Sequence, residues 1–213
     1  LIKCQRLYRL KSMGTVKSII FDIDGVLIPG DKWHEEAFIL ALADFNINIS
    51  RKFYNDKLGS LPTKSKLEII RKTHNFDFKQ SDIVNLRKQK YTKKILNSRL
   101  KRSKRLINLF QKLKKDGFKL ACCSNSVRST VEKVLHKLGL MKEIEFYLCG
   151  EDCPPKPNPI IYIKAIDRLK ITNKQALILE DSKEGLRAAR DSGARVMKIV
   201  KLRETNYKNI IKE

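Results

Sequence analysis

The chain of 213 residues has no long apolar segment and no paired pattern of cysteines. No run approaches the roughly 20 apolar residues that a membrane-spanning helix needs, so we expect a soluble protein without a membrane partner. The chain has five cysteines, an odd number, and their spacing matches no disulfide framework. This favours a protein of the reducing cytoplasm. Cys149 and Cys153 have no second Cys or His pair nearby, so a zinc site is not expected.

Acidic residues are scarce, with 23 of them against 46 lysines and arginines, and the formal net charge is +23. None occurs between Asp82 and Asp116, where Lys and Arg are dense. This tract is either a surface for a polyanion such as nucleic acid or the solvated helix face of a lysine-rich chain. Because aromatic residues that stack on bases are sparse there, we favour the solvated face and leave nucleic acid as an open alternative.

Five short apolar runs are bounded by turn residues and are expected to be strands: KSIIFDI, FKLACCS, EFYLCG, QALILE and ARVMKIV. Their nearly continuous apolar character is typical of strands that are covered on both faces. Helical patterns lie between most of them, notably RSTVEKVLHKLGL, NPIIYIKAIDRL and SKEGLRAARDSG. The alternation predicts an α/β fold with a Rossmann-like parallel-sheet core.

About ninety residues separate the first two expected strands, where a single helix would suffice. Helical patterns fill this interval, namely KWHEEAFILALADF, TKSKLEIIRKTH and QSDIVNLRKQKYTKKIL. We therefore predict an α-helical cap at residues 31–99, inserted after the first strand. The catalytic core then consists of residues 15–30 and 100–213. Residues 1–14 are expected to be an N-terminal extension outside the fold, because Met13 stands just before the first strand.

Polar residues follow four of the expected strands at the point where each strand ends. They are Asp22 and Asp24, Ser124 to Ser126, Lys156, and Glu180 with Asp181. Because the carboxyl ends of parallel strands meet at one edge of a sheet, we expect these residues to share a pocket. Clustered carboxylates without histidine favour Mg²⁺, while a lysine, a serine and helix-start N–H groups suit a phosphate. Together they indicate phosphoryl transfer.

Four segments resemble, in order, the motifs of the haloacid dehalogenase superfamily: FDIDGVL, CCSNS, KPNP and LEDSKEGLRAARDSG. The resemblance covers nearly everything after Met13 and points to the helical-cap branch, which includes β-phosphoglucomutase and small-metabolite phosphatases. A single D-x-D would be weak support, because aspartate pairs also occur in solvated turns. Four motifs in order, each in a suitable strand context, are a much stronger signal.

The resemblance implies a role for each core residue. Asp22 would be the nucleophile that takes the phosphoryl group as an aspartyl-phosphate, and Asp24 would protonate the leaving oxygen and later activate water. Ser124 and the amide of Asn125 would bind the phosphoryl oxygens. Lys156 would offset the negative charge on the nucleophile and the phosphate.

The same resemblance implies Mg²⁺ as the cofactor. Asp22, the backbone carbonyl of Asp24, and Asp181 would hold the ion. Glu180 would ligate it directly or through water; the alternative is that Glu180 is a surface acid that merely follows a strand.

Four residues of the expected cap are candidates for binding the substrate. His34 occupies a position similar to a histidine of many capped members, where it would touch the substrate or Asp24, and a structural role beside Trp33 is the alternative. The segment LGSLPTKSKLE resembles a cap loop that reaches the active site, which makes Gly59, Thr63 and Lys64 specificity candidates. For Thr63, capping of the following helix is the alternative.

These motifs predict a Mg²⁺-dependent phosphatase that acts on a small phosphorylated metabolite, with a sugar phosphate as the first choice. A β-phosphoglucomutase-like phosphosugar mutase is the alternative, because it shares every core residue. A basic nucleic-acid-binding protein, or a phosphatase of nucleic-acid ends, is a third possibility. We expect a monomer or a weak dimer.

Overall fold

The computed structural model describes residues 16–59, 61–74 and 80–213, which divide between two compact units. One unit contains the described segment up to Pro29 together with Lys101–Glu213, and the other is Gly30–Leu100. The predicted extension at residues 1–14 lies outside the described residues.

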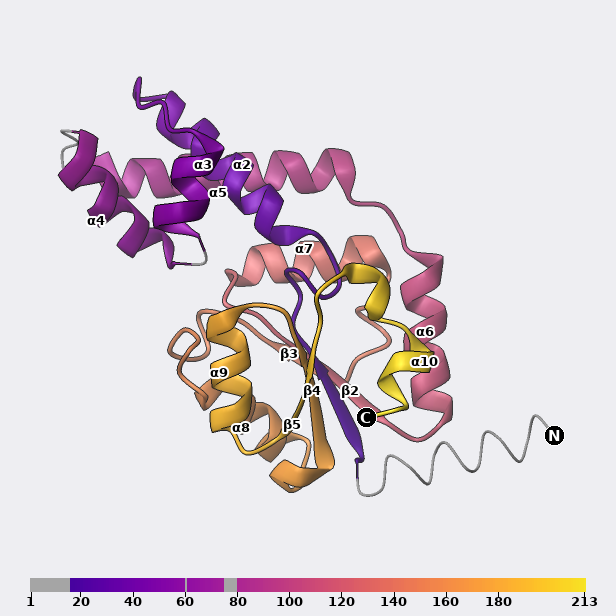
Figure 1. The fold of residues 1–213 in the computed structure, drawn as a ribbon. Coiled ribbons are helices and arrows are strands. Elements are labelled where there is room, and N and C mark those ends of the chain that lie inside the picture. The colour runs from indigo at the N-terminus through magenta and orange to yellow at the C-terminus, as the bar shows by residue number, and fades with distance from the viewer. Residues whose placement is uncertain (1–15, 60, 75–79) are drawn as a thin grey trace. The chain divides into compact units, whose positions relative to one another are not determined.

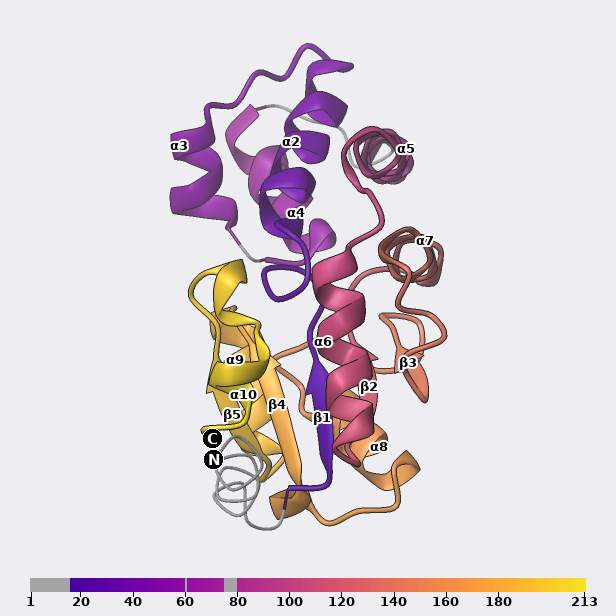
Figure 2. The same ribbon diagram turned by 90° about the vertical axis from the view of Figure 1, so that its right-hand side faces the viewer.

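A parallel sheet forms the centre of the first unit. Its five strands follow the order β3-β2-β1-β4-β5, and Figure 2 shows them in that order from right to left. All neighbouring strands pair in parallel, which confirms the predicted α/β, Rossmann-like core. The strands are β1 (Ser18–Phe21), β2 (Lys119–Cys123), β3 (Phe146–Leu148), β4 (Ala176–Glu180) and β5 (Arg195–Lys198).

Helices cover both faces of this sheet, with α6 and α10 on one side of the strands in Figure 1 and α8 and α9 on the other. The bounds are α6 (Lys104–Lys115), α7 (Arg128–Leu138), α8 (Ile160–Arg168), α9 (Lys183–Asp191) and α10 (Tyr207–Ile210). The unit also contains 3₁₀ turns at Asn173–Gln175 and Leu202–Glu204. Short connections between parallel strands therefore run through helices, as the alternating pattern predicts.

The side chains of β1 show why a continuous apolar run forms a central strand here. All four residues of β1 are buried, and successive side chains alternate between the two faces. Ile20 belongs to the core cluster that contains residues of α8 and α9. On the opposite face, the ring of Phe21 stacks on Phe110 of α6 at a centroid distance of 4.5 Å. Each such fully buried side chain contributes roughly 1.5–3 kcal/mol.

The second unit is helical, as predicted for the insert. It contains α2 (Gly30–Ala43), α3 (Arg51–Phe53), a π-helical turn (Tyr54–Leu58), α4 (Thr63–His74) and α5 (Ser81–Arg99). The patterns in the sequence predicted α2, α4 and α5, but not α3 or the π-helical turn. Arg99 of α5 forms a bidentate ion pair with Glu36 of α2, with both N–O distances at 2.7 Å. No helix in the described ranges combines the length and the apolar character that a bilayer crossing requires.

Lys66 of α4 is a lysine in the interior of this helical unit. Its side chain is only 8% exposed, because it lies on the same helix face as the buried Leu67 and Ile70. The ammonium donates a hydrogen bond to the hydroxyl of Tyr54 and lies 5.8 Å from the centre of the Phe38 ring. Burial, with some help from the charge of Lys88, lowers the pKa of Lys66 to about 8.

A buried lysine of this kind predicts a measurable pH dependence of stability. The unfolded chain binds more protons than the native protein between pH 8 and the ordinary lysine value of 10.5, so wild-type stability rises across this window. From pH 7 to pH 9.5, the wild type should gain about 2 kcal/mol relative to Lys66→Met. Urea unfolding at both pH values measures the difference. Lys64→Met replaces an exposed lysine of the same helix, and its free energy of unfolding should change between the two pH values by as much as that of the wild type. An equal change in Lys66→Met and the wild type would contradict the prediction.

Candidate active site

The turn that follows β1 carries two aspartates. Asp22 is buried, and its amide donates to the carbonyl of Leu179 in β4, which extends the pairing of the two strands by one residue. Gly25 has a φ of +81°, a left-handed conformation that favours glycine. A Cβ atom at Gly25 would lie only 1.8 Å from Oδ2 of Asp181, so the turn also needs glycine to approach that carboxylate. The glycine therefore brings the β1 turn close to the end of β4.

Lys156 connects the ends of β1 and β4. Its Nζ lies 2.5 Å from Oδ1 of Asp22 and 2.5 Å from Oε1 of Glu180, and it also donates to the carbonyl of Cys123 at 3.2 Å. All three charged side chains are at least nine-tenths buried. Residues 134 positions apart in the chain thus form one ion-paired cluster, as the convergence of parallel strand ends predicted.

Glu180 is fully buried at the end of β4, so the alternative that it is a surface acid is wrong. Besides Lys156, its carboxylate accepts hydrogen bonds from the hydroxyl of Tyr162 at 2.6 Å and from the amide of Asp181 at 3.1 Å. The amide and the hydroxyl of Ser182 donate to it as well. A Cβ atom at Gly185, in the first turn of α9, would lie 2.0 Å from Oε1 of Glu180. The carboxylate therefore occupies space that only a glycine leaves open.

The charges of this cluster do not balance. Two buried carboxylates, Asp22 and Glu180, face the single ammonium of Lys156, and the carboxylate of Asp181 lies close by. Burial raises the pKa of Asp22 well above its ordinary value, although the charge of Lys156 opposes the shift. Burial alone would lower the pKa of Lys156, but the charges of Asp22 and Glu180 outweigh it and raise that pKa. A further positive charge at this site would keep the carboxylates ionised.

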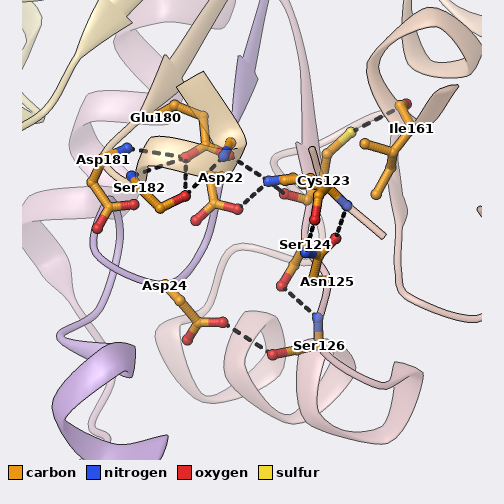
Figure 3. Close-up of polar contacts among 12 residues, drawn as sticks. Asp22, Asp24, Cys123, Ser124, Asn125, Ser126, Ile161, Glu180, Asp181 and Ser182 are labelled. Atoms are coloured by element: carbon orange, nitrogen blue, oxygen red, sulfur yellow. Dashed lines mark hydrogen bonds and ion pairs between the residues drawn. The ribbon is translucent and has the colours of Figure 1, made fainter. Parts of the chain in front are cut away.

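The donor set is suitable for a hard divalent cation. Asp22, Glu180 and Asp181 each offer a carboxylate oxygen, and these oxygens lie within 4.8 Å of one another (Figure 3). Oxygen donors, without sulfur or imidazole, are what Mg²⁺ prefers in proteins. Three of the four residues predicted as metal ligands, Asp22, Glu180 and Asp181, are therefore gathered in one place and fit the ion by their chemistry and their excess negative charge. The part of the Asp24 backbone carbonyl stays a prediction.

The segment after β2 brings Ser124, Asn125 and Ser126 to the same end of the sheet. Ser124 is buried, and its hydroxyl accepts a hydrogen bond from the amide of Ser126 at 3.0 Å. The side-chain carbonyl of Asn125 accepts a hydrogen bond from the amide of Lys156 at 2.9 Å, which connects this segment to the loop that carries Lys156. The hydroxyl of Ser126 donates to Oδ2 of Asp24 at 3.0 Å, as Figure 3 shows.

Tyr162 was not among the predicted site residues, and Ser126 was expected in the pocket but was given no role there. Ser126 belongs to the SNS segment that marked the end of β2, but nothing in the sequence indicated its bond to Asp24. Tyr162 lies in an apolar helical stretch and is fully buried, and Nζ of Lys156 lies 4.8 Å from the centre of its ring. Its hydroxyl and its ring both contact the ion-paired cluster.

The predicted specificity residues belong to the unit Gly30–Leu100. His34 lies in α2 and is partly buried, Gly59 ends the π-helical turn with a φ of +38°, and Thr63 is the first residue of α4. Lys64, the next residue of α4, is exposed. Their roles toward a substrate stay predictions.

The fold and the acidic cluster on a parallel sheet are those of a phosphoryl-transfer enzyme of the haloacid dehalogenase type. The family model for haloacid dehalogenase-like hydrolases matches residues 19–199, and this chain belongs to that family. The chain is 24% identical over 181 residues to the phosphorylated carbohydrates phosphatase of Thermotoga maritima, covering 84% of this chain and 82% of the relative. This match places the chain among the relatives of small-metabolite phosphatases.

Two further comparisons agree with this assignment. A haloacid dehalogenase-like hydrolase domain-containing protein of Arabidopsis thaliana is 26% identical over 211 residues, which span 84% of this chain and 66% of that protein. The crystal structure of β-phosphoglucomutase from Clostridium difficile superposes with a TM-score of 0.73 at 22% identity, over 92% of this chain and 88% of that one. At this level of identity, the structural likeness shows a shared fold.

Proposed function

We propose that this protein is a Mg²⁺-dependent phosphohydrolase that acts on a small phosphorylated metabolite through an aspartyl-phosphate intermediate. The observation that carries the proposal is the position of Asp22, which is buried, paired with Lys156 at 2.5 Å, and grouped with the carboxylates of Glu180 and Asp181. A carboxylate held in this way beside a lysine is suited to attack a phosphoryl group whose charge the lysine offsets.

Different residues of the core would carry out the nucleophilic attack, the proton transfers and the binding of the phosphoryl group. The Asp22 carboxylate attacks phosphorus, and the bond to the leaving oxygen breaks as Asp24 donates a proton to that oxygen. Asp24 then accepts a proton from water as the water attacks phosphorus, so that inorganic phosphate leaves and the Asp22 carboxylate is restored. Ser124, Asn125 and Lys156 would hold the phosphoryl oxygens. The bond from Ser126 to Asp24 supports this role, because it holds the proton-transferring carboxylate beside the phosphate-binding segment.

Asp22, the backbone carbonyl of Asp24, and Asp181 would hold Mg²⁺, with Glu180 as a ligand directly or through water. When bound, the ion supplies positive charge that offsets the carboxylates and the phosphoryl oxygens. The excess of carboxylates over ammonium groups in the cluster supports this assignment.

The substrate that we propose is a sugar phosphate. The relative from Thermotoga maritima is named for its action on phosphorylated carbohydrates, which favours this class. His34, Gly59, Thr63 and Lys64 would contact its leaving group. We place the reaction in a reducing cytoplasm, a proposal that the free thiols of the buried Cys122, Cys123, Cys149 and Cys153 support.

A metal-dependence assay tests this proposal. Release of inorganic phosphate from a panel of sugar phosphates should fall to background in EDTA and return when Mg²⁺ is added in excess. Ca²⁺ should restore much less, because it prefers more ligands at longer distances. Full activity in EDTA would contradict the Mg²⁺ dependence. Interconversion of hexose 1- and 6-phosphates without phosphate release would identify a phosphosugar mutase, which would use the same core residues.

A further inference from the structure

The C-terminal segment Val200–Glu213 lies outside the residues that match the family model, 19–199. It nevertheless contacts the catalytic turn, which is the turn at residues 22–28 that follows β1 and carries Asp22 and Asp24. This segment contains the 3₁₀ turn Leu202–Glu204 and the short helix α10. Figure 1 shows it, in yellow, beside α6. Ile210 and Ile211 are buried, so the segment is packed into the first unit rather than spread over its surface.

Thr205 makes the contact with the turn. Its hydroxyl donates a hydrogen bond to the backbone carbonyl of Val26 at 2.8 Å, across 179 positions of the chain. Thr205 and Val26 are both completely buried, so water does not compete for this bond. Arg105 of α6 in turn donates to the backbone carbonyl of Thr205 at 2.7 Å, which fixes the threonine from the other side.

The Val26 carbonyl belongs to the turn that positions Asp24. This turn is closed by three short-range bonds: the amides of Leu27 and Ile28 both donate to the carbonyl of Ile23, and the amide of Gly25 donates to the carbonyl of Ile28. Val26 lies two residues after Asp24, whose backbone carbonyl and carboxylate both have roles in the proposed reaction. A shift of the Val26 peptide is therefore transmitted to Asp24 through only two residues.

We propose that Thr205 is a positioning residue for phosphoryl transfer, which holds the catalytic turn through Val26, and that the C-terminal segment is part of the active-site support. This inference rests on the proposed function for its effect on turnover. Displacements of about 1 Å at reacting groups can lower rates by about 10²-fold, so the loss of this bond affects the chemical step more than substrate binding.

Tyr207, in the same C-terminal segment, provides a matched control because it makes a second contact with the rest of the unit. The hydroxyl of Tyr207 donates to Oδ2 of Asp116 at 2.6 Å, and Nζ of Lys112 lies 3.7 Å from the centre of its ring. Tyr207→Phe removes the hydroxyl but keeps the ring. It therefore loosens the segment at the end of α6 and leaves the bond from Thr205 to Val26 in place.

The experiment compares Thr205→Val, Thr205→Ser and Tyr207→Phe with the wild type, at a temperature well below the melting temperature of every variant. Thr205→Val keeps the branched shape and removes the donor; we expect kcat to fall about 10-fold with KM within about twofold. Thr205→Ser keeps the hydroxyl and should stay within about twofold of the wild type in kcat, as should Tyr207→Phe. An unchanged kcat in Thr205→Val, with a lower melting temperature alone, would overturn the proposal.

Amide hydrogen exchange provides a readout that does not depend on turnover. The amides of Gly25 and Ile28 should exchange about 10-fold faster in Thr205→Val than in the wild type, and at the wild-type rate in Tyr207→Phe. If the wild type released no phosphate, the proposed function would be refuted. The comparison of exchange rates would then still test the contact between Thr205 and Val26. Equal exchange at Gly25 and Ile28 in all the proteins would refute the positioning role.

Discussion

Asp22→Asn is expected to reduce phosphate release by about 10⁴-fold or more, because a neutral amide cannot form the aspartyl-phosphate. The substitution is nearly isosteric, and the amide oxygen can still accept the hydrogen bond from Lys156 that the carboxylate accepts at 2.5 Å. Since burial already disfavours the charge of Asp22, removing that charge should leave the free energy of unfolding within about 1 kcal/mol of the wild type, or raise it. The variant should thus be folded and inactive.

Turnover and urea unfolding of the same preparation measure both expectations. Asp191→Asn provides the matched control, because Asp191 is exposed at the end of α9 and forms an ion pair along that helix with Arg187 at 3.6 Å. This control should keep wild-type kcat and change stability by a few tenths of a kcal/mol at most. Phosphate release by Asp22→Asn at a rate near the wild type would show that another residue is the nucleophile.

The position of Asp22 was predictable from the sequence for a simple reason. Strand ends in a parallel sheet converge, so the residues after β1, β2 and β4 had to become neighbours once the alternating pattern predicted parallel pairing. Lys156 could be placed in the same site, because it follows the third expected strand and lies in the KPNP segment. The positions of residues in short motifs at the ends of parallel strands can therefore be predicted without coordinates.

Ser126, Tyr162 and Thr205 show where such reasoning fails. Each makes a side-chain hydrogen bond to a residue at least 18 positions away in the chain, and no local pattern specifies such a partner. Tyr162 in particular has the helical spacing of an ordinary core residue, and only its hydroxyl distinguishes its role. Lys66 is different, because its spacing of four from Ile70 places it on the buried face of α4, and the sequence pattern alone could have indicated it.

Lys156→Met is expected to lower the free energy of unfolding by about 3–5 kcal/mol, measured in EDTA by urea unfolding. The methionine fills a similar volume but leaves the buried carboxylates of Asp22 and Glu180 without the ammonium that contacts both at 2.5 Å. Such a loss is a large part of the 5–15 kcal/mol that stabilises a typical domain. Lys164→Met, at an exposed lysine of α8 that donates to the backbone carbonyl of Asp152, should cost less than about 1 kcal/mol.

A second substitution separates the loss of charge pairing from the loss of packing at Lys156. If uncompensated carboxylate charge causes the damage, Lys156→Met combined with Glu180→Gln should recover about 1–3 kcal/mol, because one buried charge has been removed. Excess Mg²⁺ should also raise the stability of Lys156→Met, since a cation that binds only the native protein supplies the missing charge. Neither change should restore turnover, because the lysine that contacts Asp22 is still absent. If Lys156→Met cost no more than Lys164→Met, the ion-paired cluster would contribute little to stability.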